Sequence, residues 1–359
     1  MNLEPQKIPL EILTPAWATG GNQQQAEFRV PTFRGQLRFW LRMLFPDQSR
    51  DEQIFGRADP HGAQASCVSL RLKSWQARSA TQNLEDYTGK QGDDMLHEPE
   101  AYFLWPLRPT RDSQQKRGAL YPAGTAPTAS LVLEVTWLPP ALHRRAALDG
   151  CLQQAIKAFS YLGAFGTRST RGYGSLWPCG ADFPTPAAFA KELEFLPDSV
   201  AVRLLATAAE SGRKALAEAA KWFRRLRLGT ARFGGTPSKW GKNDHDVAPI
   251  PKAGDVLFRP ALGLPLAQNY RDGPRLQTKY LWRDPDSGRE IWNDRYPSPA
   301  RLKIVRIAKE YRPVVVLLRD QLLPETTRLR VEQRGSPPRE TRLSHELFEQ
   351  LSSAGDAIH

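Results

Sequence analysis

Hydrophobic periodicity along the first half of the chain predicts a compact mixed domain. Alternating apolar residues are typical of strands, and apolar residues three or four positions apart are typical of helices. In chain order they predict a strand at 8–13, helix at 35–45, strand at 67–75, strand at 131–137, helix at 142–163 and short strand near Leu176. This order, strand, helix, strand, strand, helix, strand, is that of a ferredoxin-like domain.

The second half shows a similar alternation after a proline-rich joint, "CGADFPTPAAF". The joint predicts a domain boundary, with an N-terminal domain at 1–185 and a C-terminal domain at 186–359. The patterns predict a strand at 200–204, a basic helix at 212–228, strands at 301–307, 313–318 and 326–332, and a helix beginning near Ser344. The predicted fold class is therefore α+β with long loop insertions.

One insertion, at about 80–125, separates the two middle strands of the first domain. Its first part is acidic, because six carboxylates stand against Lys90: Glu85, Asp86, Asp93, Asp94, Glu98 and Glu100. This acidic first part is predicted to be an exposed or mobile loop.

Charge adds the first indication of a partner. The chain of 359 residues has a formal net charge of +12, which favours a polyanion, nucleic acid before a membrane surface. A basic surface without a partner is the alternative. Three widely spaced cysteines form no CxxC pair, the N-terminus does not resemble a signal peptide, and the longest apolar run, "PVVVLL", is too short for a membrane span. We expect a cytoplasmic protein with no membrane association.

Three arginines form a stripe along the first predicted helix. Arg34, Arg38 and Arg42 are spaced four residues apart, and no carboxylate occurs between Glu27 and Asp47. Cations without a neighbouring anion favour an anionic ligand, and the helix N-terminus near Gly35 would add amide donors. Pairing with carboxylates from elsewhere in the fold is the alternative.

The segment "FGTRSTRGYGSL" combines glycines with arginines. Gly166, Gly172 and Gly174 allow close approach of another backbone, and Arg168 and Arg171 offer donors suited to phosphate. In a ferredoxin-like order this loop and the loop after the first strand can flank one groove, which would suit a sugar–phosphate chain. Tyr173 could stack on a base, although a tyrosine between glycines can also anchor packing.

Catalytic and metal-binding patterns are poor. The six histidines lack ligand spacing, and no Walker, GxSxG or GxGxxG motif occurs. The segment "NDHDV" at 243–247 is interpreted as a turn and not as an acid–base pair. The basic cluster of Lys221, Arg224, Arg225 and Arg227 is interpreted as a solvated helix face. We expect no enzyme activity, no cofactor and no metal.

Several motifs together resemble a known family. "TPAWATGGNQQQAEFRVPTFRGQLRFWLRML" with "IFG", "YLGAFGTRSTRGYGSL", "FRPALGLPLAQNYRDGP" and "RYPSPARLKI" are similar to the first subunit of the Cmr effector complex of type III-B CRISPR systems, within the RAMP superfamily. The resemblance implies two ferredoxin-like (RRM-like) RAMP domains in tandem. It also implies a cytoplasmic, antiviral ribonucleoprotein in which this subunit contacts guide and target RNA near the 3′ end of the guide, beside other RAMP subunits.

The resemblance, read together with the patterns above, also proposes RNA-binding residues. These are Arg29, Arg34, Gly35, Arg38, Arg42, Gly166, Arg168, Arg171, Gly172, Tyr173 and Gly174. Related subunits that cleave RNA use an aspartate in an early loop, and this chain has none before Asp47, which agrees with a non-catalytic subunit. The alternatives are a metal-independent endoribonuclease that processes guide RNA and a protein–protein adaptor without RNA contact.

Overall fold

A computed structural model provides the structure of the chain. It describes residues 4–59, 62–75, 77–95, 97–109, 116–122, 130–230, 235–252, 254–264, 266–269, 275–283, 288–333 and 335–359. Parts of the predicted insertion at 80–125 and of the motif at 258–274 lie outside these residues. The chain forms two compact units. Unit 1 comprises Met1–Ala220, Leu302–Val316 and Asp356–His359, and unit 2 comprises Lys221–Arg301 and Leu317–Gly355.

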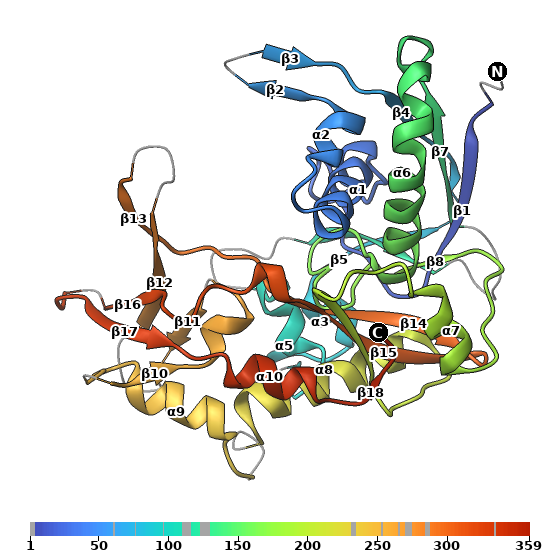
Figure 1. Cartoon of the computed structure of the whole chain (residues 1–359). Coiled ribbons are helices and arrows are strands. Elements are labelled where there is room, and N and C mark those ends of the chain that lie inside the picture. Colours follow the sequence, from blue (N-terminus) through green and yellow to red (C-terminus); the bar gives the residue numbers. More distant parts are fainter. Residues whose placement is uncertain are drawn as a thin grey trace. The chain divides into compact units, whose positions relative to one another are not determined.

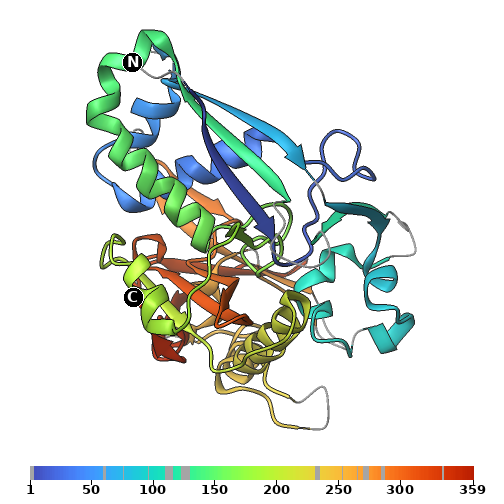
Figure 2. The same ribbon diagram turned by 90° about the vertical axis from the view of Figure 1, so that its right-hand side faces the viewer.

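The first predicted ferredoxin-like arrangement is present in unit 1. Its elements are β1 (Gln6–Ile12), α1 (Val30–Leu44), β4 (Val68–Trp75), β7 (Leu131–Trp137), α6 (Leu142–Leu162) and β8 (Leu176–Pro178). The strands form an antiparallel sheet in the order β4-β7-β1-β8, with the first and third strands at its centre. Helices α1 and α6 pack side by side on one face of this sheet (Figures 1 and 2).

Helix α1 begins earlier than the sequence pattern suggests. The predicted start was Gly35, whereas the helix begins at Val30 and has Pro31 in its first turn. Proline suits this position because the first amides of a helix have no intrahelical partner. Phe33 and Leu37 of α1 are fully buried, as are Leu152 and Phe159 of α6, so these two helices supply much of the core over the sheet.

The same topology recurs in the second half. Its elements are β9 (Val200–Leu204), α8 (Gly212–Leu228), β14 (Ala300–Ile307), β15 (Glu310–Leu318), α10 (Glu346–Ser352) and β18 (Asp356–Ala357). The sheet order β14-β15-β9-β18 places the first and third strands at the centre again. Two ferredoxin-like arrangements within an α+β fold are therefore confirmed. The predicted boundary at 185/186 stays a prediction.

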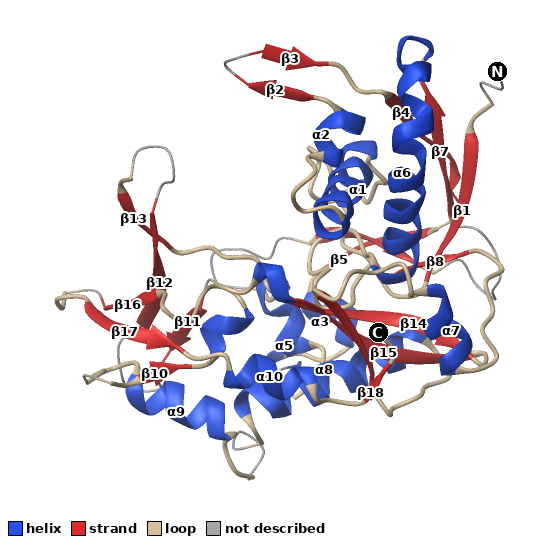
Figure 3. Cartoon of the chain, viewed as in Figure 1, coloured by secondary structure: helices blue, strands red, loops and turns tan. Residues whose placement is uncertain are grey.

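A separate sheet occupies unit 2 (Figure 3). It consists of β10 (Val256–Leu257), β11 (Leu266–Asn269), β12 (Arg275–Arg283), β13 (Glu290–Asn293), β16 (Arg328–Gln333) and β17 (Arg339–Leu343). The strand predicted at 326–332 corresponds to β16 and belongs to this sheet. Helix α9 (Lys239–Val247) precedes it, and 3₁₀ turns lie at Arg259–Leu262 and Arg319–Gln321.

The remaining short elements lie in the sequence between the strands and helices named above. Helix α2 (Arg50–Phe55) is followed by a hairpin of β2 (Arg57–Asp59) and β3 (Gly62–Gln64), and α7 (Pro186–Glu192) precedes β9. A 3₁₀ turn at Pro139–Ala141 leads into α6. The segment 243–247, predicted as a turn, is instead the last part of α9. Its Asp244 is fully buried, and its carboxylate accepts hydrogen bonds from the backbone amides of Phe258 and Arg259, at 2.9 Å each.

The prediction that the acidic first part of the insertion is an exposed or mobile loop is wrong for the described residues. The described part of the insertion is folded. This part contains β5 (Arg78–Gln82), α3 (Leu84–Thr88), α4 (Gly92–Met95), α5 (Ala101–Leu104), a 3₁₀ turn at Trp105–Leu107 and β6 (Arg117–Tyr121). Strands β5 and β6 pair with each other, and Leu84, Phe103 and Leu104 are buried. Asn83 and Asp86 form a reciprocal cap at the start of α3, which explains why an acidic sequence folds here.

Candidate functional site

The loop after β1 and the glycine-rich loop before β8 lie against each other, as predicted. The amide of Thr167 donates to the carbonyl oxygen of Trp17 at 2.7 Å, and the amide of Gly174 donates to that of Pro15 at 2.8 Å. The Thr14 hydroxyl donates to the carbonyl oxygen of Gly172 at 2.6 Å. The two loops are therefore joined by backbone and side-chain hydrogen bonds within unit 1.

The glycines of this loop are needed for packing within the protein. Gly166 has φ +84°, and a Cβ there would lie 2.6 Å from the carbonyl oxygen of Trp17. Gly174 has φ +67°, and its Cβ would collide with the carbonyl oxygen of Phe165. Gly172 is buried. The backbone that approaches Gly166 and Gly174 is thus the chain's own, which corrects the expectation that these glycines leave space for a ligand backbone.

Strand β14 of the second sheet holds the other side of the glycine-rich loop. The Leu302 amide donates to the carbonyl oxygen of Thr170 at 3.1 Å, and the Ile304 amide donates to the Ser175 hydroxyl at 3.0 Å. Lys303, between them, is fully buried, and its ammonium donates to the carbonyl oxygens of Gly163 and Leu176. Burial lowers the pKa of Lys303 well below its ordinary value. The sequence analysis missed this lysine, although its place among apolar strand residues was a signal.

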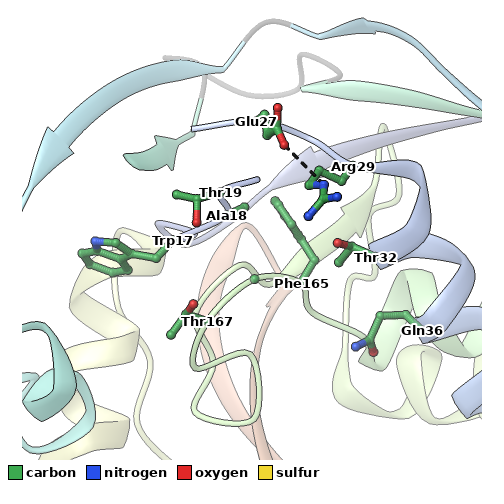
Figure 4. A pocket seen from close by; sticks show the side chains of 10 residues that line it. Trp17, Ala18, Thr19, Glu27, Arg29, Thr32, Gln36, Phe165 and Thr167 are labelled. Carbon is green, nitrogen blue, oxygen red and sulfur yellow. Dashed lines mark ion pairs between the residues drawn. The ribbon is translucent and has the colours of Figure 1, made fainter. Parts of the chain in front are cut away.

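A pocket of about 290 Å³ opens where the two loops meet the first turns of α1 (Figure 4). Three segments supply its walls, and the residues are Trp17, Ala18, Thr19, Glu27, Arg29, Thr32, Gln36, Phe165, Gly166 and Thr167. Trp17 and Phe165 form apolar walls but are almost fully buried. The groove predicted between the two loops therefore exists in the form of this pocket.

One ion pair stands at the pocket. Arg29, the residue before α1, lies 3.3 Å from Glu27, and their side chains are 48% and 44% exposed. The first turn of α1 contains no acidic residue, so the positive end of the helix dipole is not offset there. An exposed pair of this kind is weakly held, and Arg29 can exchange its partner for an external anion.

The premise that the arginine stripe lacks a carboxylate partner is wrong. The guanidinium groups of Arg38 and Arg42 lie 3.2 Å and 3.6 Å from the carboxylate of Asp51 in α2. Arg38 also donates to the carbonyl oxygen of Gly56 at 2.8 Å, and the Arg34 guanidinium lies 5.8 Å from the ring centroid of Phe55. The stripe thus faces α2.

The stripe and the pocket lie on different sides of α1. Arg34 and Arg38 each follow a pocket residue, Thr32 and Gln36, by two positions, and two positions turn a helix by about 200°. The expected convergence of the stripe with the two loops does not occur. Gly35 is exposed, and a Cβ at this position would meet nothing within 4 Å.

The two arginines of the glycine-rich loop have different surroundings. Arg168 is partly buried in a left-handed conformation with φ +66°, and it follows the pocket residue Thr167. Burial lowers the pKa of Arg168, and no carboxylate of the described residues forms an ion pair with it. Arg171 donates to the carbonyl oxygen of Thr170 at 3.3 Å. Arg168 is therefore the cation of this loop that is best placed for an external anion.

Tyr173 cannot stack on a base in this structure, which corrects that expectation. Its side chain is fully buried. Its ring makes edge contacts with Trp17 and Tyr87, at centroid distances of 5.3 Å and 6.4 Å. The alternative, a packing anchor between glycines, is the one that the structure bears out.

The insertion reaches the glycine-rich loop through Tyr87. The Tyr87 hydroxyl donates to the buried carboxylate of Glu100 at 2.9 Å, and Arg213 of α8 donates to the Tyr87 carbonyl oxygen at 2.8 Å. Burial raises the pKa of Glu100, although the hydrogen bond from Tyr87 and the charge of Arg213 act in the opposite direction. This buried polar group supports the loop from the side of the insertion.

Within the described part of the chain, no group of three or more His, Cys, Asp and Glu side chains is arranged to hold a metal ion. No helix among the described residues is long and apolar enough to cross a membrane. Glu27 is the one titratable acid among the pocket residues, and it is paired with Arg29.

Comparison with known families identifies the part of the chain that contains this site. The model of the RAMP superfamily matches residues 9–177, from β1 to β8. This part of the chain is therefore similar to the RAMP superfamily. The match includes both loops and every residue of the pocket, so the pocket is a feature of the RAMP region. No curated protein sequence matches the chain significantly.

One solved structure shows that the likeness in fold extends further. The crystal structure of Cmr1 from Pyrococcus furiosus in its apo form has a TM-score of 0.53 and 15% identity, and the match covers 97% of this chain and 95% of that one. A cryo-EM structure of type III-B Cmr-beta bound to cognate target RNA has a TM-score of 0.49 and 11% identity, covering 88% and 94%. The predicted resemblance thus agrees with the match of residues 9–177 to the RAMP superfamily model, and the likeness in fold to Cmr1 extends over 97% of the chain.

Proposed function

We propose that this chain is a non-catalytic, RNA-binding subunit of a type III-B CRISPR ribonucleoprotein, the Cmr complex. It contacts guide RNA, target RNA or both near the 3′ end of the guide, and its other partners are RAMP subunits of the same complex in the cytoplasm. The RAMP region and the fold shared with Cmr1 support this assignment.

The observation that carries the proposal is the meeting of two loops, each with an arginine, around one pocket that contains polar side chains. Arg29 stands at the pocket, and Arg168 follows its wall residue Thr167. A net charge of +12 draws an RNA strand toward the protein. Phosphate contacts at these cations position the strand, while base pairing between guide and target supplies sequence specificity.

The other predicted contact residues have different parts in this proposal. Gly166, Gly172, Gly174 and Tyr173 shape the loop from within, and Arg171 is partly engaged with the loop's own backbone. Arg34, Arg38 and Arg42 form a second basic surface beside α2, which keeps an excess of positive charge because Asp51 is shared by two of them. We assign the first phosphate contacts to Arg29 and Arg168.

We expect the variants Arg29→Ala and Arg168→Ala to weaken RNA binding by about tenfold each, since each removes a charged hydrogen bond to phosphate. For wild type contacting about four to six phosphates, the logarithm of affinity falls with the logarithm of salt at a slope of about −3 to −4. Each variant reduces that slope by about 0.7. Fluorescence anisotropy with labelled single-stranded RNA at several salt concentrations measures both quantities.

The matched control is Arg319→Ala, which removes a surface arginine that pairs with Glu349 at 3.7 Å in unit 2. This variant should bind RNA as the wild type does. Arg168 and its alanine replacement share the strain of a positive φ, so the melting temperature should change little. Unchanged RNA affinity in the double variant would contradict the proposal. Discrete cleavage of labelled guide precursor by the pure protein in EDTA would replace it with an endoribonuclease.

A further inference from the structure

The pocket contains polar side chains that the protein itself does not use. Thr19, Thr32, Gln36 and Thr167 are all partly exposed. Among the described residues, no partner forms a hydrogen bond with the hydroxyl groups of these threonines or with the amide of Gln36. In Figure 4, Thr32 and Gln36 lie along one side of the pocket and Thr19 and Thr167 along the other. A ligand in the pocket would meet uncharged donors and acceptors on both sides.

The size of the pocket limits what this ligand can be. Small-molecule sites have volumes of about 300–1,000 Å³, and about 290 Å³ lies at the lower end of this range. Such a pocket can accept one nucleoside unit of a strand but not several. Arg29 also lines the pocket, so its guanidinium is available to a phosphate of a strand that enters there.

The chemistry of the walls favours the sugar over the base. A base stacks on the open face of an aromatic ring, but Trp17 and Phe165 are each only 1% exposed. Hydroxyl and amide groups both donate and accept hydrogen bonds, and the ribose 2′-hydroxyl does the same. Recognition of this hydroxyl is what lets a protein distinguish RNA from DNA.

We propose that this pocket takes one ribose of the bound strand and that Thr32, Gln36 and Thr167 hydrogen-bond its 2′-hydroxyl, so that the pocket selects RNA over DNA. The inference rests on the proposed RNA-binding function and adds a specificity to it. The phosphate contacts of Arg29 and Arg168 would serve RNA and DNA equally, whereas the pocket would serve only RNA.

The experiment compares the affinities of the full chain for single-stranded RNA and DNA of the same sequence. Wild type should prefer RNA by about tenfold or more. The variant Gln36→Met, and the combined variant with Thr32→Val and Thr167→Val, remove hydrogen-bonding groups and keep similar volumes. We expect these variants to lose RNA affinity by about three- to tenfold while DNA affinity stays unchanged, so that the preference shrinks.

Two controls separate this result from other causes. Gln154→Met changes a partly buried glutamine of α6 outside the pocket and should keep the RNA preference. Arg168→Ala should weaken RNA and DNA binding by the same factor. Melting temperatures show whether each variant folds, and the single Gln36→Met variant decides the question if the combined variant does not.

The possible failures point to different claims. If wild type binds no RNA, the proposed function fails. If wild type binds RNA and DNA equally, or if Gln36→Met leaves the preference intact, RNA binding can stand but the ribose pocket is wrong. Loss of RNA and DNA affinity together in Gln36→Met would also overturn the inference, because it would indicate a general effect on the surface.

Discussion

Glycines that look alike in the sequence differ in whether the structure requires them. Gly166 and Gly174 are required because the chain's own backbone occupies the space of a side chain. Gly35, in contrast, is exposed within α1, and its surroundings are open. A helix interior disfavours glycine, and no packing contact among the described residues requires one at this position. We infer that Gly35 leaves room for an approaching RNA backbone.

The variant Gly35→Ala tests this reasoning. It should raise the free energy of unfolding by about 0.5–1 kcal/mol, because alanine favours a helix over glycine, and it should lower RNA affinity. Gly150→Ala in α6 is the matched control, since a Cβ there also meets nothing within 4 Å. It should give the same stabilisation with unchanged RNA affinity. Denaturant titrations and RNA binding measure the two effects, and equal RNA affinities in both variants would exclude close approach at Gly35.

The roles of single residues could be predicted from the sequence where the residues that they contact lie close to them in the chain. The glycine-rich loop was recognised from its own composition. The arginine stripe was misread because its partner, Asp51, lies beyond the helix that carries the stripe. Lys303 was missed because its two carbonyl partners belong to a segment more than 120 residues away.

At the scale of elements, the insertion is a folded support for the glycine-rich loop. Tyr87 of α3 contacts both Trp17 and Tyr173, with ring centroids 5.1 Å and 6.4 Å away. Its hydroxyl is held by Glu100, which precedes α5. Acidic residues of this segment therefore have structural roles: Glu100 accepts a buried hydrogen bond, and Asp86 caps helix α3.

This arrangement predicts a pH-dependent stability. The pKa of Glu100 is raised above 4.5 by burial, so the folded protein holds an extra proton between pH 4.5 and the raised pKa. Its contribution to stability is therefore present below pH 4.5 and is lost as the pH rises through that raised value. Glu100→Gln should remove this dependence, because a neutral amide can still accept the hydrogen bond from Tyr87.

Melting temperatures from pH 4 to pH 8 measure the difference between wild type and Glu100→Gln. The control Glu85→Gln removes a partly exposed carboxylate from α3 and should leave the pH profile of the wild type unchanged. Parallel pH profiles for wild type and Glu100→Gln would show that Glu100 is not the group responsible.

Long periodic elements could be predicted well, and short capped ones could not. The four strands of the first ferredoxin-like arrangement, strands β9, β14 and β15 of the second, and helix α8 lie close to their predicted positions, whereas β18 was not predicted. The three short helices of the insertion, α3, α4 and α5, were not predicted, because four or five residues are too few to show a helical periodicity. The predicted first residue of helix α1 was too late in the sequence, because the proline of its first turn was assigned to the preceding loop.

At the scale of the whole molecule, one sheet topology occurs twice, and an edge strand of the second sheet holds a loop of the first repeat. Strand β14 receives the glycine-rich loop through the amides of Leu302 and Ile304 and the ammonium of Lys303. All of these residues belong to unit 1. The shape of the proposed binding loop therefore depends on both repeats.

The variant Lys303→Met should lower the free energy of unfolding by about 1–3 kcal/mol, because two buried carbonyl groups lose their donor. RNA affinity should fall as well, since the glycine-rich loop loses the hydrogen bonds that Lys303 donates on either side of it. Urea titration and RNA binding measure the two losses. Lys309→Met, at the exposed tip of the same hairpin, should change neither quantity. A Lys303→Met protein as stable as the wild type would show that the ammonium does not hold the loop.

The contacts of Lys303 also have a consequence for folding during synthesis on the ribosome. Gly163 and Leu176 precede Lys303 by 140 and 127 residues. At about 5–20 residues per second, the ribosome makes the loop roughly 6–25 s before it makes the lysine. During that interval the nascent chain lacks the lysine that donates to the carbonyl oxygens of Gly163 and Leu176, so the glycine-rich loop gains this support only after β14 has been made.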